Sequence, residues 1–413
     1  MTARSCQDDQ YTDSMQHLRR LMVGVLTFVL LAHAVPAQAA DPNDANLTAS
    51  WLARTLASNN DLAQTPTGDS DYASTAYALL GLKAAGVAAD QIRASSEAMA
   101  ASEDSFIGTP DQVDSKTTAI SLMILAMQTG DLDPSTYLGS TGTRDLYADL
   151  QSTIQPDGAV STAPTAYGQS FAILALFGAD SGIPDQMLTW LLAQPCTDAS
   201  SPGFGGYGFA GPGSCDDADP DSTALAVIAL ASASTSAGSK AVSDSRTFLT
   251  SVQDPSGGFA SPFSGINANT TGLAVAALNA ISPGSSEAAK GVDFLESLMY
   301  GCDAGTDLAG AMALTTDART STQITPLADS DQALFFQASA QGIYGFVGMA
   351  PPTTYEFGSV DVPSPSCPTA VSSAATAPST ATGASDWLWA IGGFLVVVLV
   401  YVGWRFIISG RRS

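Results

Sequence analysis

Three aspartates precede an apolar run in the segment DADPDSTALAVIAL, which covers residues 217–230. Carboxyl groups at this spacing can supply a general acid, oxygen atoms that hold a ligand, or the polar start of a helix. Asp221, the third of them, is a candidate for each role. The choice depends on the rest of the chain and on the elements that position this segment.

Most other catalytic chemistry is excluded by the residue types present. The two histidines, His17 and His33, precede the predicted mature domain, which leaves that domain without an imidazole base or zinc ligand. No phosphate loop or dinucleotide fingerprint occurs. We expect no metal and no cofactor. With 39 acidic and 15 basic residues the chain repels nucleic-acid phosphates, so nucleic acid is not an expected partner.

The N-terminal segment has the pattern of a secretory signal peptide. Two arginines precede an apolar run over residues 21–35, and small residues follow it. This pattern predicts a signal peptide over residues 1–40, cleaved near Ala39 or Ala40. A retained N-terminal anchor is the alternative, although the run is short for a membrane span.

The C-terminal segment predicts a membrane anchor. Residues 387–404 carry no charge, and arginines follow them. We expect a transmembrane helix over 387–408, a cytoplasmic tail over 409–413, and a Ser/Thr/Ala/Pro-rich stalk over 359–386. Residues 41–358 then form an ectodomain outside the cell membrane, where a small-molecule ligand or an exported protein partner can reach it.

Four cysteines follow the predicted cleavage site: Cys196, Cys215, Cys302 and Cys367. An even count in an exported chain indicates two disulfides. Pairing Cys196 with Cys215 closes a glycine-rich loop, and pairing Cys302 with Cys367 ties the last helices to the stalk. Four cysteines allow three connectivities, and the sequence leaves the choice open.

The opening segment has five relatives along the chain, whose last residues are separated by 43 to 60 positions. Such spacing is typical of stacked supersecondary units. The six runs are apolar nearly all round a helix, which predicts buried inner helices over 71–82, 114–125, 165–176, 219–230, 267–278 and 327–338. Amphipathic outer helices are predicted between them over 47–58, 90–102, 143–154, 184–194, 243–253 and 288–299.

Six inner and six outer helices predict an all-α fold, a closed α6/α6 toroid, because closure removes the exposed end repeats of an open solenoid. The pattern resembles the superfamily of terpenoid cyclases and protein prenyltransferases over residues 44–346. The segments QDPSGGF (253–259) and QPCTDASSPGFGGYGF (194–209) resemble its glycine–aromatic motif, and DPDSTA resembles the cyclase acid motif.

The resemblance to squalene–hopene-type cyclases implies that Asp219 and Asp221 match the first two acids of the motif, with Asp221 as general acid. Ser222 replaces the third acid, and one toroid is present where those enzymes use two. The protein-prenyltransferase zinc site has no matching histidine. A carboxylate-dependent glycan-active enzyme is a further alternative, with Tyr207, Phe209, Phe259 and Phe263 available to stack on sugars.

The predicted architecture also resembles that of single-toroid binding proteins such as intrinsic factor and transcobalamin, and their role is the closest to the one expected for this chain. That resemblance implies a ligand held by the toroid, with a corrinoid as one candidate. The leading hypothesis is therefore a membrane-anchored, non-catalytic toroid that binds a ligand or a partner, and a cyclase-like enzyme is the alternative.

Aligned position by position, the six repeats separate cap residues from candidate site residues. The column of Asp219 contains favoured helix N-caps in five of six repeats: Asp71, Asp114, Thr165, Asp219, Asn267 and Leu327. No helical rule requires the mixture in the Asp221 column: Ala73, Lys116, Tyr167, Asp221, Asn269 and Asp329. We expect its polar members, Lys116, Tyr167, Asp221, Asn269 and Asp329, to form a ligand-binding ring at one mouth of the toroid.

Overall fold

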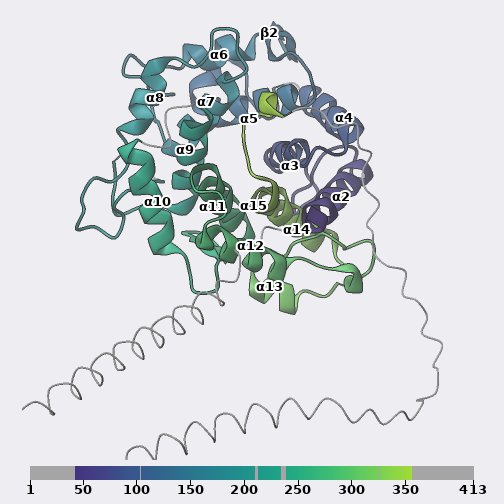
Figure 1. The fold of residues 1–413 in the computed structure, drawn as a ribbon. Coiled ribbons are helices and arrows are strands. Elements are labelled where there is room, and N and C mark those ends of the chain that lie inside the picture. The colour runs from purple at the N-terminus through teal and green to yellow at the C-terminus, as the bar shows by residue number, and fades with distance from the viewer. Residues whose placement is uncertain (1–41, 103, 210–212, 234–238, 325, 356–413) are drawn as a thin grey trace, which may run out of the picture. The chain divides into compact units, whose positions relative to one another are not determined.

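The computed structural model describes residues 42–102, 104–209, 213–233, 239–324 and 326–355 (Figure 1). The predicted signal peptide, stalk and transmembrane helix lie outside these residues. No helix in the described part of the chain is both long and apolar enough to cross a membrane.

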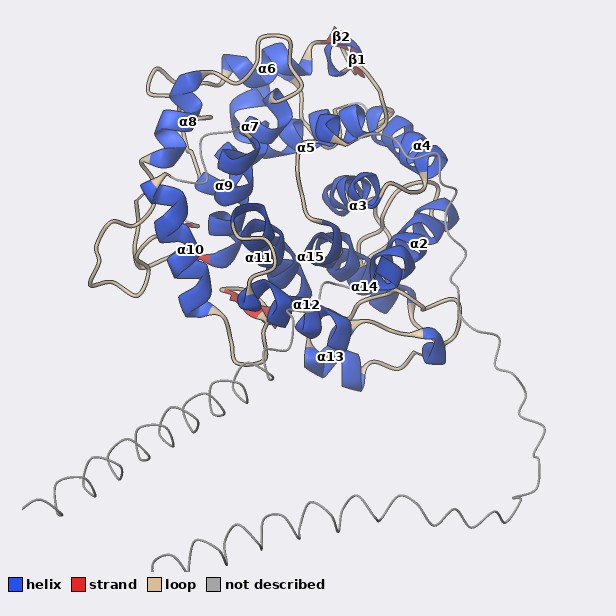
Figure 2. Cartoon of the chain, in the orientation of Figure 1, coloured by secondary structure: helices blue, strands red, loops and turns tan. Residues whose placement is uncertain are grey.

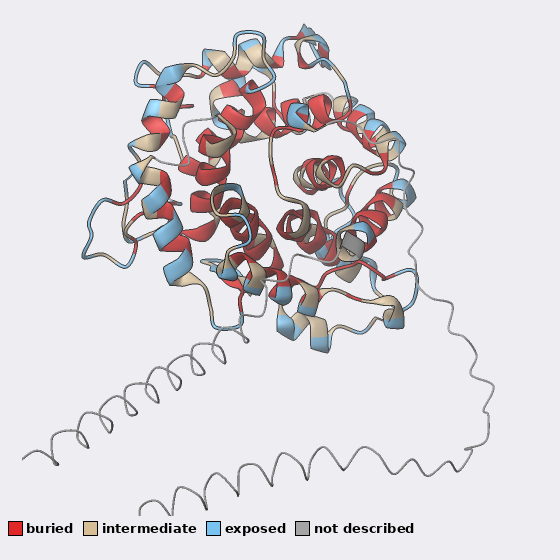
Figure 3. Cartoon of the chain, viewed as in Figure 1, coloured by how far each residue is buried: buried red, intermediate tan, exposed pale blue. Residues whose placement is uncertain are grey.

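Six inner helices form a closed ring (Figure 1). Each packs against the next, and the sixth packs against the first. They are buried on nearly all sides, as Figure 3 shows, because their apolar residues leave no polar face. The inner helices are α3 (Tyr72–Ala85), α5 (Thr117–Thr129), α7 (Ala166–Leu176), α9 (Pro220–Ser232), α11 (Ala268–Ile281) and α14 (Asp329–Gly342).

Six amphipathic helices surround this ring, each packed on an inner helix. Most of their exposed residues lie on the side away from the ring, as the pale blue segments in Figure 3 show. The outer helices are α2 (Pro42–Ser58), α4 (Ala89–Ala100), α6 (Leu146–Ser152), α8 (Asp185–Leu192), α10 (Lys240–Val252) and α12 (Ser286–Leu298). The predicted alternation of outer and inner helices is therefore present in the structure.

Short elements that the helical pattern did not predict lie in the connections (Figure 2). Three antiparallel hairpins pair β1 with β2, β3 with β4, and β5 with β6. Their strands are β1 (Tyr137–Gly139), β2 (Gly142–Arg144), β3 (Tyr207–Gly208), β4 (Ala218–Asp219), β5 (Phe259–Ser261) and β6 (Gly265–Asn267). The remaining helices are η1 (Pro110–Lys116), η2 (Pro134–Thr136), η3 (Cys302–Ala304), α13 (Thr316–Ser321), α15 (Tyr344–Val347) and η4 (Pro352–Thr354).

Glycine turns dock the connections onto the outer helix of the next repeat. Gly257 has φ +93°, and a Cβ there would lie 2.1 Å from the Lys290 carbonyl oxygen of α12. At Gly310 the corresponding distance, to the Leu47 oxygen of α2, is 2.0 Å. Only glycine permits this approach. The same arrangement occurs at Gly158 and Gly205, which explains the glycine motif in structural terms.

Four of the predicted N-caps are present. The side chains of Asp71, Thr165, Asp219 and Asn267 each accept a hydrogen bond from the backbone N–H three residues later. Asp114 differs: α5 begins at Thr117, directly after η1, and the Asp114 carboxylate accepts from the Thr162 N–H at 3.0 Å instead.

The sixth repeat is shifted by eight residues from the predicted register. A pair of hydrogen bonds marks the same position in each of three repeats. The Thr223 hydroxyl accepts a bond from the Tyr207 N–H and donates one to the carbonyl oxygen four residues earlier. The Thr75 and Thr271 hydroxyls do the same, each accepting from a backbone N–H of its own repeat. Ser339 makes the equivalent pair of bonds, to Met312 N–H and Phe335 O. Gln337 therefore occupies the position of Asp221, and the prediction of Leu327 and Asp329 in these columns was wrong, because α14 begins two turns earlier than the other inner helices.

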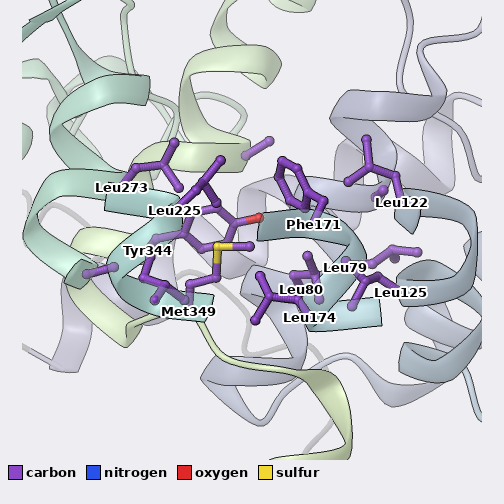
Figure 4. Close-up of a cluster of buried hydrophobic side chains, with 14 of the residues drawn as sticks. Leu79, Leu80, Leu122, Leu125, Phe171, Leu174, Leu225, Leu273, Tyr344 and Met349 are labelled. Atoms are coloured by element: carbon purple, nitrogen blue, oxygen red, sulfur yellow. The ribbon is translucent and has the colours of Figure 1, made fainter. Parts of the chain in front are cut away.

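The chain turns into the ring after α14 and crosses it. The α15 helix packs against α11, α12 and α14, whereas η4 packs against α5 and α3. Tyr344 and Met349 from this crossing segment lie among leucines of the inner helices (Figure 4). Thr353 of η4 lies beside Gly178, just beyond the C-terminal end of α7. The segment therefore lies against α3 and α5 and reaches the C-terminal end of α7.

A disulfide joins Cys196 and Cys215, which confirms that predicted pairing. It closes the loop that contains β3. Cys302 is also disulfide-bonded. Its proposed partner, Cys367, lies outside the described residues.

Candidate functional site

Asp221 lies in the first turn of α9, at the mouth formed by the N-terminal ends of the inner helices. Its carboxyl accepts a 3.2 Å hydrogen bond from the Thr270 hydroxyl of α11. Burial, and secondarily the neighbouring carboxyl of Asp219, raises the pKa of Asp221 to about 7, although the Thr270 bond opposes the shift. Asp221 is therefore partly protonated at neutral pH and retains some accessible surface.

Two tyrosines meet across the ring beside Asp221. The hydroxyl oxygens of Tyr77 on α3 and Tyr167 on α7 are 2.9 Å apart, although α5 lies between these helices in the ring. Burial raises the pKa of Tyr77 to about 12, and the pKa of Tyr167 also lies well above its usual value, with burial the largest cause. The negative charge of Asp221 contributes to both shifts, which reflects its proximity to the pair.

Gln337 and Asp71 continue the polar cluster where the last inner helix meets the first. The Gln337 amide donates to the Asp71 carboxylate at 3.0 Å. The same carboxylate accepts bonds from the backbone N–H and hydroxyl of Ser74. This mouth thus brings together side chains from α3, α7, α9, α11 and α14.

The remaining predicted residues have different surroundings. Asn269 is half-buried, and its Oδ1 has no hydrogen-bond partner in the described part of the chain. Lys116, also half-buried, ends η1, and no hydrogen bond or ion pair among the described residues joins it to the other candidates. Asp329 is exposed at the start of the extended α14. The structure brings together Tyr167 and Asp221, places Asn269 one residue before Thr270, and leaves Asp329 away from the cluster by two helical turns.

Sequence reasoning missed Tyr77, Gln337 and Tyr344. Tyr77 lies four residues after Ala73, so one helical turn separates it from a position that was identified. Gln337 was missed because the sixth repeat was aligned eight residues too early, which placed Asp329 in its column. The Tyr344 hydroxyl donates to the Tyr77 carbonyl oxygen at 2.7 Å, and only the crossing of the chain through the ring brings it there.

The layer below the polar cluster is mainly apolar. Four residues after the polar positions, Phe171, Leu225 and Leu273 are fully buried with Tyr344 (Figure 4). Phe171 contacts the rings of both Tyr77 and Tyr167. No group of three His, Cys, Asp or Glu side chains that could hold a metal occurs in the described residues. The arrangement can offer hydrogen-bond acceptors, aromatic faces and one carboxyl that titrates near neutrality.

The four aromatic residues suggested for sugar stacking divide into two pairs. Tyr207 and Phe259 are fully buried and unavailable to a ligand. Phe209 and Phe263 are exposed and contact each other.

Comparisons with known proteins identify no family. No protein-family model and no curated protein sequence matches the chain. Among solved structures, it is similar to a type II terpene cyclase from Scytonema in complex with geranylgeranyl dihydroxybenzoate. The match has 12% sequence identity and a TM-score of 0.48, and it covers 74% of this chain and 97% of the cyclase chain.

Proposed function

We propose that this protein is a membrane-anchored toroid outside the cell that binds a small-molecule ligand at the mouth formed by the N-terminal ends of its inner helices. The observation that carries the proposal is the partly accessible polar cluster of Tyr77, Tyr167 and Asp221 at that mouth, with Asn269 in the matching first turn of the next inner helix. The anchor and the exported location rest on the two terminal sequence patterns. A corrinoid is one candidate ligand.

Two features support this mouth as the binding surface. The chain's own segment around Met349 and η4 reaches the opposite end of the ring, where Thr353 lies beside Gly178 at the end of α7. At the N-terminal mouth, by contrast, the Asn269 Oδ1 acceptor lacks a partner among the described residues. A buried acceptor without a donor costs about 1–3 kcal/mol, and a ligand that donates a hydrogen bond recovers part of that free energy.

Acid catalysis is the second candidate function. Asp221 is partly protonated near neutral pH and lies beside aromatic rings and an apolar layer, which are features that a cyclase-like general acid could use. However, a carboxyl with a pKa of about 7 is a weaker acid than an ordinary aspartic acid. Protonation of an alkene requires a stronger acid, so the raised pKa of Asp221 favours the binding proposal over cyclization.

The test is a binding screen on residues 41–367, which are the predicted ectodomain with the part of the stalk that carries Cys367. Corrinoids, isoprenoids and oligosaccharides are titrated by calorimetry, and the mixtures are analysed for products. We expect one class to bind without turnover. The expected loss in Asn269→Ala or Tyr167→Phe is about tenfold in affinity, equivalent to about 1.4 kcal/mol.

Asp329→Asn is the matched control, since it changes an exposed acid in the first turn of another inner helix. Its affinity should equal that of the parent protein. Binding that is unchanged in the Asn269 and Tyr167 variants argues against the mouth as the site. Turnover that disappears in Asp221→Asn replaces the binding proposal with the catalytic one.

A further inference from the structure

Two exposed phenylalanines form a pair on separate hairpins. Phe209 is 43% exposed and Phe263 is 74% exposed, and their rings form an edge-to-face contact with centroids 5.1 Å apart. Five large apolar side chains are exposed in the described part of the chain, and these two are the only ones among them joined by an aromatic contact. If the pair served only to hold the two hairpins together, we would expect both rings to be buried in the contact, but both remain accessible to water.

The positions of the hairpins place this pair at the rim of the N-terminal mouth. Phe209 follows β3, and its N–H donates to the Asp217 carbonyl oxygen just before β4. Phe263 lies in the turn between β5 and β6. Because β4 and β6 end at the N-caps of α9 and α11, both hairpins lie at the end of the ring that carries Asp221.

The two segments that carry the pair are acidic, although Asp219 among their carboxyl groups is only 1% exposed and Asp221 belongs to the candidate ligand site. Residues 194–222 and 253–269, which contain the two hairpins, include six aspartates and no lysine or arginine. Asp216 is exposed close to Phe209 along the chain. Lys240 lies over the Phe204 ring of the first segment, 5.3 Å from its centroid, and is paired with Asp244. A partner that fits this surface therefore presents basic side chains around an apolar pocket.

We propose that the Phe209–Phe263 pair is a docking surface for a second protein whose contact face combines an apolar pocket with lysine or arginine side chains. Phe263 is in a hairpin turn with most of its surface exposed, which suits insertion into a partner's pocket. Aromatic residues commonly dominate the affinity of such interfaces, and the surrounding acids steer and orient a basic partner. The proposal is independent of the ligand bound at the mouth.

The experiment uses the full chain in the cells that produce it. A photo-crosslinking amino acid replaces Phe263 in one variant and Leu138 in another. Leu138 is the matched control because it is 64% exposed on a different hairpin, β1–β2, which packs on the connection between α4 and α5 through Ser140 and Arg144. We expect position 263, and not position 138, to capture a protein, which is then identified and purified.

Affinity for the purified partner decides the proposal. We expect the double variant Phe209→Ser/Phe263→Ser to bind at least about tenfold more weakly, Leu138→Ser to bind normally, and the affinity to fall as salt increases. Asn269→Ala should bind the partner normally, which separates this surface from the ligand site. Melting curves establish that the variants fold. If the double variant does not fold, the single variant Phe263→Ser is measured in its place.

Three results overturn the proposal. One is the absence of a protein captured specifically at position 263. Another is partner binding that is insensitive to the phenylalanine substitutions or to salt. The third is crosslinking to lipid, with binding to zwitterionic vesicles that depends on the same two phenylalanines.

Discussion

Asp219 and Asp221 lie two residues apart and interact with different groups. Asp219 is 1% exposed and caps α9 through the Ser222 N–H at 3.0 Å, whereas Asp221 points to the Thr270 hydroxyl of the next inner helix. Burial raises the pKa of both carboxyl groups. The capping bond explains why an aspartate occupies position 219. Asp221 has no structural role of comparable strength and remains the candidate functional residue.

The raised pKa of Asp221 predicts a pH-dependent stability. An unfolded aspartate has a pKa near 3.9, and the folded value is about 7, so the native state binds more protons between these values. Stability from this group is fully present below the unfolded pKa and is lost as pH rises through about 7. We expect Asp221→Asn to raise the free energy of unfolding by about 2 kcal/mol at pH 8 and by little at pH 4.

Urea unfolding at the two pH values measures this difference. Asp329→Asn provides the control, because its carboxyl is exposed in the first turn of α14. An Asp221→Asn effect that has the same size at pH 4 and pH 8 contradicts the assignment. Asp219 remains in the variant, so only part of the parent protein's pH dependence should disappear.

At the scale of elements, four glycine turns determine where their connections meet the neighbouring outer helix, at Gly158, Gly205, Gly257 and Gly310. Gly68 and Gly257 close the same kind of turn, with N–H bonds to the carbonyl oxygens of Thr65 and Asp254. Both have a positive φ, of +89° and +93°. They differ in surroundings: a Cβ at Gly68 has no heavy atom within 4 Å, whereas at Gly257 it meets the α12 backbone.

This difference predicts unequal costs for the same substitution. Gly68→Ala adds only backbone strain, and we expect it to lower the free energy of unfolding by about 1 kcal/mol. Gly257→Ala adds a clash with the Lys290 carbonyl, and we expect a loss of about 3 kcal/mol or more. Denaturant unfolding of both variants gives the comparison, and equal losses would mean that the turn at Gly257 can move away from α12.

At the scale of the whole molecule, closure depends on contacts between the two ends of the described chain. The Gln337 amide on α14 reaches the Asp71 carboxylate on α3, 266 residues away in sequence. Gly310 packs its turn on the backbone of α2. The apolar contact between α14 and α3 accompanies these polar and backbone contacts, so the last repeat completes the core of the first.

Loss of the closing hydrogen bond predicts a measurable destabilisation. We expect Gln337→Ala to lower the free energy of unfolding by about 1 kcal/mol. Gln332→Ala, on the same helix and also half-buried, should change it by less than about 0.5 kcal/mol. Thermal and urea unfolding test the pair. If the two variants lose the same stability, the Gln337–Asp71 bond does not contribute to closure.

The sequence by itself determined the alternation of helices, because a fully apolar run and a one-sided apolar stripe bury different faces. It also identified four helix caps, whose side chains act within their own first turn. Tertiary structure decided the position of Gln337, the meeting of Tyr77 with Tyr167, and the path of the segment that crosses the ring. These features depend on contacts across the ring between residues far apart in the chain, and a local repeat pattern carries no information about which of them meet.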